Sequence, residues 1–351
     1  MIQEIRIENM RGIRMGAITG MSPLTVLVGP SGAGKSTALE ALLLGAGGTP
    51  GSAIARVVIR RVETKGAARW LFWRGGRTDD PTIRIHVGLD GEPPRAITLR
   101  LASEVDRDLE EKLTVTRARA PFAQINADLA WGEREREVRA RTALSYDNLY
   151  AFEQRAVSID QRGELPPGRV RLVDPRPGGM HAPLWKSYME AFEGGRAGEV
   201  EALVREVIPD LDRIVPLSDD DGQSLVHLGY KDHSVPVALA GDGIQTLVQV
   251  SLAVAQSAGS TVLLEEPESA QHPRAAYWTA RAISAAVKRG VQVILSTHSL
   301  ELIDWLLAGM EGHLEKMSLH QMACRDGALV VARFAGTDVD AARDVIGEDF
   351  R

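Results

Sequence analysis

A glycine-rich run followed by a lysine and two hydroxyl residues lies near the start of this 351-residue sequence. The run is Gly29, Pro30, Ser31, Gly32, Ala33, Gly34, Lys35, Ser36 and Thr37. It fits the pattern G-x-x-x-x-G-K-[ST], in which glycines let backbone N–H groups turn toward the phosphates. Lys35 adds a positive charge, and the Ser36 hydroxyl suits Mg²⁺. We therefore expect this loop to bind a nucleoside triphosphate together with Mg²⁺.

The residues on either side of this loop have the pattern that such a loop needs. The apolar run 24–28 precedes it and predicts a buried strand, and residues 36–44 predict a helix whose N-terminus would face the phosphates. A chance glycine-rich turn between a strand and a helix is the alternative. The strand, loop and helix context favours the phosphate loop.

Two adjacent carboxylates follow a second apolar run. Glu265 and Glu266 come directly after residues 261–264, which predict a buried strand. Ligand groups of an α/β sheet lie at the carboxyl ends of its strands. Hydrolysis of a nucleotide needs one carboxylate to hold the Mg²⁺ shell and another to polarise the attacking water, roles that suit Glu265 and Glu266 respectively. The alternative is a charged cap on a following helix.

A histidine follows the next apolar run. His298 comes after residues 291–295 and the polar pair Ser296 and Thr297, so we expect it at the same sheet edge as Glu266 and Lys35. There it could contact the γ-phosphate or the attacking water. The alternative is that His298 is a structural side chain whose hydrogen bonds are made within the fold. His272, which follows the carboxylates, can equally be a turn residue.

A short glycine-containing segment precedes a predicted helix over 243–258. It consists of Gly241, Asp242 and Gly243, with Gln245 nearby. Glycines before a helix N-terminus can offer N–H groups to an anion, although an ordinary helix start with Asp242 near the cap explains the same residues.

The order of predicted elements divides the chain. After residue 238 strands and helices alternate, with helices also at 274–288 and 299–308, so we expect one mostly parallel sheet that includes the strand before the phosphate loop. A long insertion over 51–237 interrupts it. Strands are predicted in this insertion at 55–61, 69–73, 82–87, 96–101, 113–116, 211–215 and 224–230, and helices at 131–162, 184–192 and 197–207. The acidic cluster at 219–221 predicts a hairpin turn, which suits Asp and Gly better than a metal site.

The bulk properties exclude several classes of protein. The formal net charge of −6 argues against a surface that coats nucleic acid throughout. A local basic stretch from Arg56 to Arg77, with interleaved aromatics, suits DNA or partner contact, although a solvated strand face is the alternative. Cys324 is the single cysteine, so no internal disulfide can form. No run reaches the roughly 18 apolar residues of a membrane span, and the start lacks a signal-peptide pattern, so we expect a cytoplasmic protein.

Taken together, these motifs resemble the ATP-binding-cassette (ABC) ATPases, in the branch that includes RecF, the structural-maintenance-of-chromosomes (SMC) heads and the overcoming-lysogenization-defect (OLD) ATPases. The resemblance covers residues 1–48 and 238–310. It implies an α/β P-loop NTPase of the ABC-ATPase type across residues 1–351, with a mostly parallel core sheet, an antiparallel β subdomain and a helical insertion. The Glu266-Pro267-Glu268 and His272-Pro273 motifs resemble the OLD-like branch.

The resemblance also implies roles for particular residues. Lys35 and Ser36 would hold Mg-ATP, with Asn9 and Arg11 reaching the nucleotide. Glu266 would polarise water and His298 would sense the γ-phosphate. Gly241, Asp242, Gly243 and Gln245 would meet the ATP of a second subunit, which implies a homodimer or higher oligomer. Two departures are Glu265 in place of the Walker B aspartate and Gly241 in place of the signature serine; Gln124, Gln154 and Gln161 all remain possible for the glutamine loop.

The resemblance also bears on the partner. The segment after His298 is too short for the metal-dependent TOPRIM nuclease domain of OLD nucleases, and no heptad arms are present. We therefore expect an ATP-driven switch that hydrolyses ATP and regulates a separate effector, by analogy a nuclease, or DNA, in repair or anti-phage defence. The alternatives are an ATP-locked oligomeric scaffold with negligible hydrolysis and the ATPase subunit of a transporter.

Overall fold

The computed structural model describes most of the chain, and the chain forms two compact units. The described residues are 1–59, 67–78, 81–115, 123–132, 136–147, 154–164, 170–174, 184–218, 222, 224–255, 258–346 and 349–350. The first unit contains Met1–Gly20, Ser31–Val170 and Met322–Val331; the second contains Met21–Pro30, Arg171–Gln321 and Ala332–Arg351.

An antiparallel sheet forms the first unit. Its strands follow the order β8-β7-β6-β5-β4-β1-β2, and neighbours in this run pair antiparallel. Their bounds are β1 Ile2–Met10, β2 Ile13–Thr19, β4 Thr82–Leu89, β5 Glu92–Leu101, β6 Ala123–Trp131, β7 Arg136–Asp147 and β8 Gln154–Gly163. At the other edge β2 pairs in parallel with β16 (Ala328–Ala335), through Met15 and Ala328.

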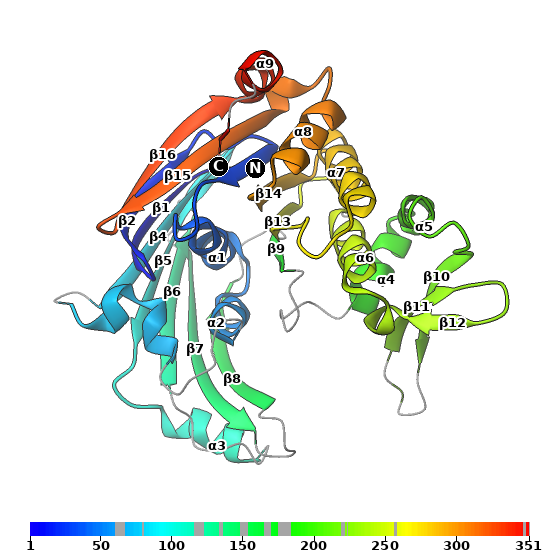
Figure 1. Cartoon of the computed structure of the whole chain (residues 1–351). Helices are drawn as coiled ribbons and strands as arrows, with labels where there is room; N and C mark the ends of the chain where they lie inside the picture. The colour runs from blue at the N-terminus through cyan, green and yellow to red at the C-terminus, as the bar shows by residue number, and fades with distance from the viewer. Residues whose placement is uncertain are drawn as a thin grey trace. The chain divides into compact units, whose positions relative to one another are not determined.

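Helices cover this sheet along its length (Figure 1). Helix α1 (Lys35–Ala46) packs on β1 and β4, α2 (Pro50–Ile59) packs on β7 and β8, and α3 (Arg107–Val115) packs on β8. Gly45 shows how closely α1 approaches the sheet, because a Cβ at this position would lie 2.6 Å from the Val87 side chain. Two short 3₁₀ helices, η1 (Ala67–Leu71) and η2 (Trp73–Gly76), complete the unit.

The second unit contains the predicted parallel sheet. Strand β3 (Leu24–Val28) lies between β14 (Gln292–Ser296) and β15 (Met317–Arg325), and β13 (Thr261–Glu265) and β9 (Val170–Val173) follow in the order β15-β3-β14-β13-β9. The β15–β3, β3–β14 and β14–β13 pairs are all parallel. Every residue of β3, β13 and β14 is buried, which explains why these runs show no alternation of apolar and polar residues.

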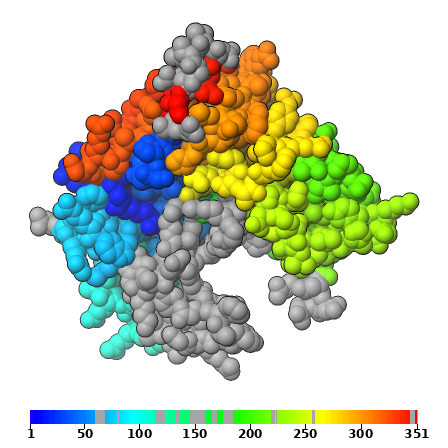
Figure 2. Space-filling model, viewed as in Figure 1, coloured from blue at the N-terminus to red at the C-terminus, as the bar shows by residue number. Residues whose placement is uncertain are grey.

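Helices flank the parallel sheet, and a smaller lobe joins them. Helices α6 (Asp242–Val254), α7 (Pro273–Lys288) and α8 (Leu300–Gly309) pack in that order, with η4 (Leu314–Lys316) and α9 (Gly336–Ile346) after them. The lobe has the sheet β10-β11-β12, and its apolar side chains form one hydrophobic cluster with those of α6 (Figures 1 and 2). Its elements are α4 Leu184–Glu193, α5 Ala197–Arg205, β10 Arg213–Ser218, β11 Ser224–Gly229, β12 Ser234–Pro236 and η3 Val237–Leu239.

Several strands predicted in the insertion are helical. Residues 55–59 of the predicted strand 55–61 belong to α2, in which Ile54, Val57 and Val58 are all buried, and positions 60 and 61 lie outside the described residues. A spacing of three and four residues marks one face of a helix, and the β-branched composition hid this signal. The predicted strands 69–73 and 113–116 were also wrong, since η1 and η2 occupy the first and α3 the start of the second.

The helix predicted over 131–162 was also wrong, because this segment contains the strand β7 and most of the strand β8. In β7 the buried Val138, Ala140 and Thr142 alternate with Glu137, Arg139 and Arg141. That alternation is the period of a strand. Of the mixed charges that suggested a helix, Glu137, Arg139 and Arg141 lie on the more exposed face of β7, and positions 133–135 lie outside the described residues. The acidic cluster 219–221 lies outside the described residues. Within the described part of the chain, no helix has the length and hydropathy that crossing a membrane requires.

Candidate functional site

The phosphate loop leaves the carboxyl end of β3 and ends at α1. Gly29, Gly32 and Gly34 all have positive φ angles, of 136°, 83° and 94°, which non-glycine residues rarely adopt. Gly34 is the N-cap of α1 and no side chain caps it, so the first N–H groups of this helix suit an anion. Ser31 and Gly32 are exposed, Ser36 is half-buried and Lys35 is only 6% exposed.

The register of the parallel sheet sets the edge from which this loop starts. Glu265 of β13 lies opposite Ser296 of β14, and Ser296 lies opposite Leu27 of β3. The residues that follow these three strands therefore lie at one edge of the second unit: Glu266, Thr297 with His298, and Gly29. The sequence predicted this common edge for the carboxylates and the histidine.

Glu266 and His298 approach each other at that edge. The His298 Nε2 atom lies 3.7 Å from Glu266 Oε1, and both side chains are about one-third exposed, at 39% and 33%. Glu266 has a φ of 45°, a left-handed conformation that costs a non-glycine residue roughly 1–2 kcal/mol. Its N–H donates to the Ser296 carbonyl oxygen over 3.0 Å, which holds this turn in place. A strained backbone at a strand end is typical of functional sites.

Glu268 and Thr297, to which the sequence assigned no role, link two loops. The carboxylate loop, residues 266–272, follows β13, and the histidine loop, residues 297–299, follows β14. The Thr297 hydroxyl donates to Glu268 Oε1 over 2.5 Å, and the His298 N–H donates to the same oxygen over 3.4 Å. Burial raises the pKa of the Glu268 carboxyl, and the hydrogen bond from Thr297 opposes this shift. The Glu266-Pro267-Glu268 motif was visible in the sequence, but only the fold shows what Glu268 contacts.

The structure places Asn9 and Arg11 in contacts within the first unit. Arg11 Nε lies 2.5 Å from Glu40 Oε2 on α1, and Arg11 also donates to the Val57 carbonyl oxygen over 3.1 Å. Asn9 donates its side-chain N–H to the Thr82 carbonyl oxygen over 3.1 Å. Glu40 is fully buried. These contacts give Arg11 a structural role beside the phosphate-loop helix.

The segment predicted to act in trans opens α6 as expected. Gly241 is an extended N-cap, and Gly241 and Asp242 are exposed. Gln245 is turned back toward the preceding turn, since its amide donates to the Ala238 and Ala240 carbonyl oxygens. Gly243 must be small, because a Cβ there would lie 3.0 Å from the Ala270 carbonyl oxygen. His272 caps α7 by accepting from the Arg274 N–H, as a turn residue does.

Two of the glutamines considered for the glutamine loop have structural contacts. Gln124 is 1% exposed and bonds to Asp106 and Asn126. Gln161 accepts from the Gly51 N–H at the start of α2. The side chain of Gln154 lies outside the described part.

A Mg²⁺ ion that accompanies a triphosphate is compatible with the residues at hand. Among the described residues, no group of three or more His, Cys, Asp and Glu side chains is placed to hold a metal. Mg²⁺ needs only one or two protein oxygens when phosphates and water supply the rest. Ser36 of the first unit offers a hydroxyl, and Glu265 of the second unit offers a carboxylate that is 1% exposed. Each of these oxygens is of a kind that Mg²⁺ accepts.

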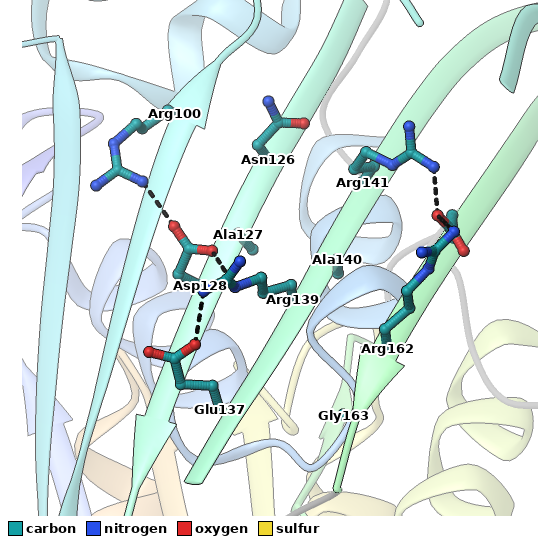
Figure 3. A pocket seen from close by; sticks show the side chains of 11 residues that line it. Arg100, Asn126, Ala127, Asp128, Glu137, Arg139, Ala140, Arg141, Arg162 and Gly163 are labelled. Atoms are coloured by element: carbon teal, nitrogen blue, oxygen red, sulfur yellow. Dashed lines mark hydrogen bonds and ion pairs between the residues drawn. The ribbon is translucent and has the colours of Figure 1, made fainter. Parts of the chain in front are cut away.

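A second candidate is a charged groove of about 770 Å³ on the sheet of the first unit (Figure 3). Arg100 pairs with Asp128 at 2.7 Å and Arg139 with Glu137 at 2.9 Å. Arg141 bonds to Asp160, Asp108 and Asp106, and these bonds raise the pKa of its guanidinium. Arg162, which also lines the groove, lies 3.4 Å from Asp160. Because all four arginines are paired with carboxylates, the groove lacks the excess positive charge that a phosphate chain requires.

The parallel sheet, the glycine loop at its edge and the carboxylates that follow the next strands define a P-loop NTPase of the ABC-ATPase type. The chain belongs to the family described as "AAA domain, putative AbiEii toxin, Type IV TA system", whose model matches residues 24–304.

The chain is also similar to two individual proteins and to a solved structure. The chain is 22% identical to an "ATP/GTP phosphatase" of Helicobacter pylori over 87% of both proteins. It is 31% identical to the "Uncharacterized protein MJECL11" of Methanocaldococcus jannaschii over 32% of this chain and 98% of that protein. Among solved structures it resembles the Smc head domain with an extended coiled coil, bound to the C-terminal domain of ScpA, from Pyrococcus furiosus. That match has a TM-score of 0.50 at 10% identity over 99% of both chains, and it shows the fold alone.

Proposed function

We propose that this protein is an ATP-hydrolysing switch. The observation that carries the proposal is the approach of Glu266 and His298 to 3.7 Å at the sheet edge where the phosphate loop begins. A carboxylate can take a proton from the attacking water, and an imidazole beside it can orient that water or contact the γ-phosphate. The similarity to the Helicobacter pylori ATP/GTP phosphatase supports hydrolysis.

Each of the other residues has a defined task in this proposal. The N–H groups of residues 31–37 and the Lys35 ammonium bind the phosphates and stabilise the charge that develops on them. Ser36 and Glu265 would hold Mg²⁺, which would neutralise phosphate charge when bound. Because Glu265 is buried and Glu266 is partly exposed, we assign the metal shell to the first carboxylate and the water to the second.

Release of phosphate from ATP tests this function. We expect turnover by the wild-type protein that is lost in Lys35→Ala. A Glu311→Gln variant is the control, because Glu311 is exposed and follows the C-terminal end of α8, the end opposite His298. Turnover that persists in Lys35→Ala would show that the phosphate loop does not carry the activity.

We further propose that two copies dimerise around ATP. Gly241 and Asp242 are exposed at the start of α6, so their N–H groups can meet a γ-phosphate of a second copy even without the usual serine. Light scattering with ATP should show a dimer in Glu266→Gln and a monomer in Glu266→Gln combined with Gly241→Pro. A dimer in both variants would remove Gly241 from the interface.

The effector is proposed by analogy alone. A separate nuclease or DNA is the partner that the OLD resemblance favours. A pull-down with the product of the neighbouring gene, with and without ATP, tests the protein partner. An ATP-locked scaffold is the second candidate, and Gly241 in place of a serine favours it. It requires ATP-dependent assembly with turnover far below the usual enzyme range of about 1 per second or faster.

A further inference from the structure

Glu268 joins the loop that follows β13 to the loop that follows β14. Its Oε1 atom accepts from the Thr297 hydroxyl and from the His298 N–H, at 2.5 and 3.4 Å. Thr297 Oγ1 in turn accepts from the Ser299 N–H over 2.9 Å, at the N-cap of α8. One carboxylate oxygen therefore holds the start of the histidine loop.

Hydrogen bonds within the carboxylate loop and one bond from α7 hold this loop in place. Ser269 donates its N–H to the Glu266 carbonyl oxygen, and the Gln271 side chain donates to the Pro267 carbonyl oxygen. Thr279 of α7 then donates to Gln271 Oε1 over 3.0 Å. Because this loop is fixed to α7, the Glu268 side chain starts from a rigid backbone.

The second oxygen of Glu268 has an unusual environment. Glu268 Oε2 is buried and has no hydrogen-bond partner among the described residues. A buried polar atom without a partner costs roughly 1–3 kcal/mol. Removing this carboxyl therefore need not destabilise the fold, which favours a role in the site over a role in stability alone.

We propose that Glu268 is a positioning residue that sets where the His298 imidazole lies relative to the Glu266 carboxylate. This inference rests on the proposed hydrolysis for its catalytic consequence, but not for its geometry. Glu268 acts through its contacts with the Thr297 hydroxyl and the His298 N–H. Without it the His298 loop loses its link to the carboxylate loop, so the 3.7 Å approach of the two side chains is no longer fixed.

Variants of Glu268 and Thr297 that keep or remove their hydrogen bond distinguish a role in positioning His298 from a role in packing. We expect Glu268→Ala and Thr297→Val to lower kcat at least tenfold with ATP affinity within twofold of the wild type. Glu268→Gln keeps an acceptor oxygen and Thr297→Ser keeps the hydroxyl, so each should recover most of that loss. Glu311→Ala is the matched control. Equal kcat in Glu268→Ala and Glu268→Gln, or a fall in melting temperature without a change in kcat, would overturn the proposal.

A double-mutant comparison tests whether Glu268 acts through His298. The kcat of Glu268→Ala with His298→Ala should equal that of His298→Ala alone within about twofold, since a shared function cannot be lost twice. A double variant whose loss of kcat equals the product of the two single losses would contradict the proposal.

Nuclear magnetic resonance of the His298 imidazole, assigned by its absence in His298→Ala, decides the geometry without any turnover. Its signals should shift in nucleotide-free Glu268→Ala and stay in place in Glu311→Ala. Unchanged signals in Glu268→Ala would overturn the inference. A wild-type protein without Lys35-dependent turnover would defeat the proposed function instead, and the resonance comparison would still decide the role of Glu268.

Discussion

The Thr297 N–H donates a hydrogen bond to the Leu27 carbonyl oxygen over 3.1 Å. This bond continues the pairing of β14 with β3 one residue beyond the end of β14. The loop that presents His298 is therefore fixed to the strand that leads into Gly29. Because Glu268 binds the Thr297 hydroxyl, Thr297 links β3, the carboxylate loop and the histidine loop.

Replacement of Arg11 should destabilise the fold more than it weakens ATP binding. In Arg11→Met the fully buried Glu40 loses a cation that lies 2.5 Å away, and a buried ion pair that loses one partner costs about 3–5 kcal/mol. Urea unfolding measures this loss. The matched control is Arg100→Met, whose pair with Asp128 is about half exposed and contributes less than about 1 kcal/mol. Unchanged stability with a tenfold weaker affinity for ATP would instead support the direct contact with the nucleotide that the family resemblance implied.

Stability should fall in mild acid because of His320. This residue of β15 is fully buried, and burial lowers the pKa of its imidazole to about 4 from 6.5. Between pH 6.5 and pH 4 the unfolded chain gains a proton on His320 and the folded protein does not. The contribution of this residue to the free energy of unfolding is therefore fully present above pH 6.5 and decreases as the pH falls from 6.5 toward 4. Between pH 7 and pH 5 the loss from this group should be about 2 kcal/mol.

The His320→Leu variant isolates that contribution. Urea unfolding of both proteins at pH 7 and pH 5 gives the difference between their pH dependences. The variant should lose less stability on acidification than the wild type. Equal losses would show that folding does not lower the pKa of His320.

The basic stretch should give salt-sensitive binding to DNA. Arg69, Arg74 and Arg77 are exposed, and Trp70 is 59% exposed beside them; the other basic residues of the stretch after Arg56, at positions 60, 61 and 65, lie outside the described residues. Reversal of the three charges to glutamate should weaken binding to a DNA duplex. It should also reduce the slope of log affinity against log salt by about 2–3. Fluorescence anisotropy at several salt concentrations checks this, and an unchanged slope would remove this surface from DNA contact.

The sequence predicted the parallel sheet and its edge because those signals are local. Uninterrupted apolar runs mark β3, β13 and β14, and the polar residues that follow each run must lie at one edge when the strands are parallel. The phosphate loop was readable for the same reason, since its glycines, Lys35 and Ser36 are consecutive.

The insertion was predicted less well because its signals conflict. The β-branched residues of α2 favoured a strand, while the burial of Ile54, Val57 and Val58 follows a helical period. In β7 the charges favoured a helix although Val138 and Ala140 alternate with them. The contacts of Arg11 with Glu40 and of Glu268 with Thr297 join segments far apart in the chain, so no local pattern could reveal them.

The steady-state rate of ATP hydrolysis in Glu266→Gln tests the central claim most directly. Glutamine keeps the shape of the side chain and removes its charge, so the phosphate loop should remain intact. We predict a loss of kcat of about 10²–10⁴-fold, the contribution of a general base, with an affinity for ATP within about threefold of the wild type. Hydrolysis at the wild-type rate in Glu266→Gln would contradict the account.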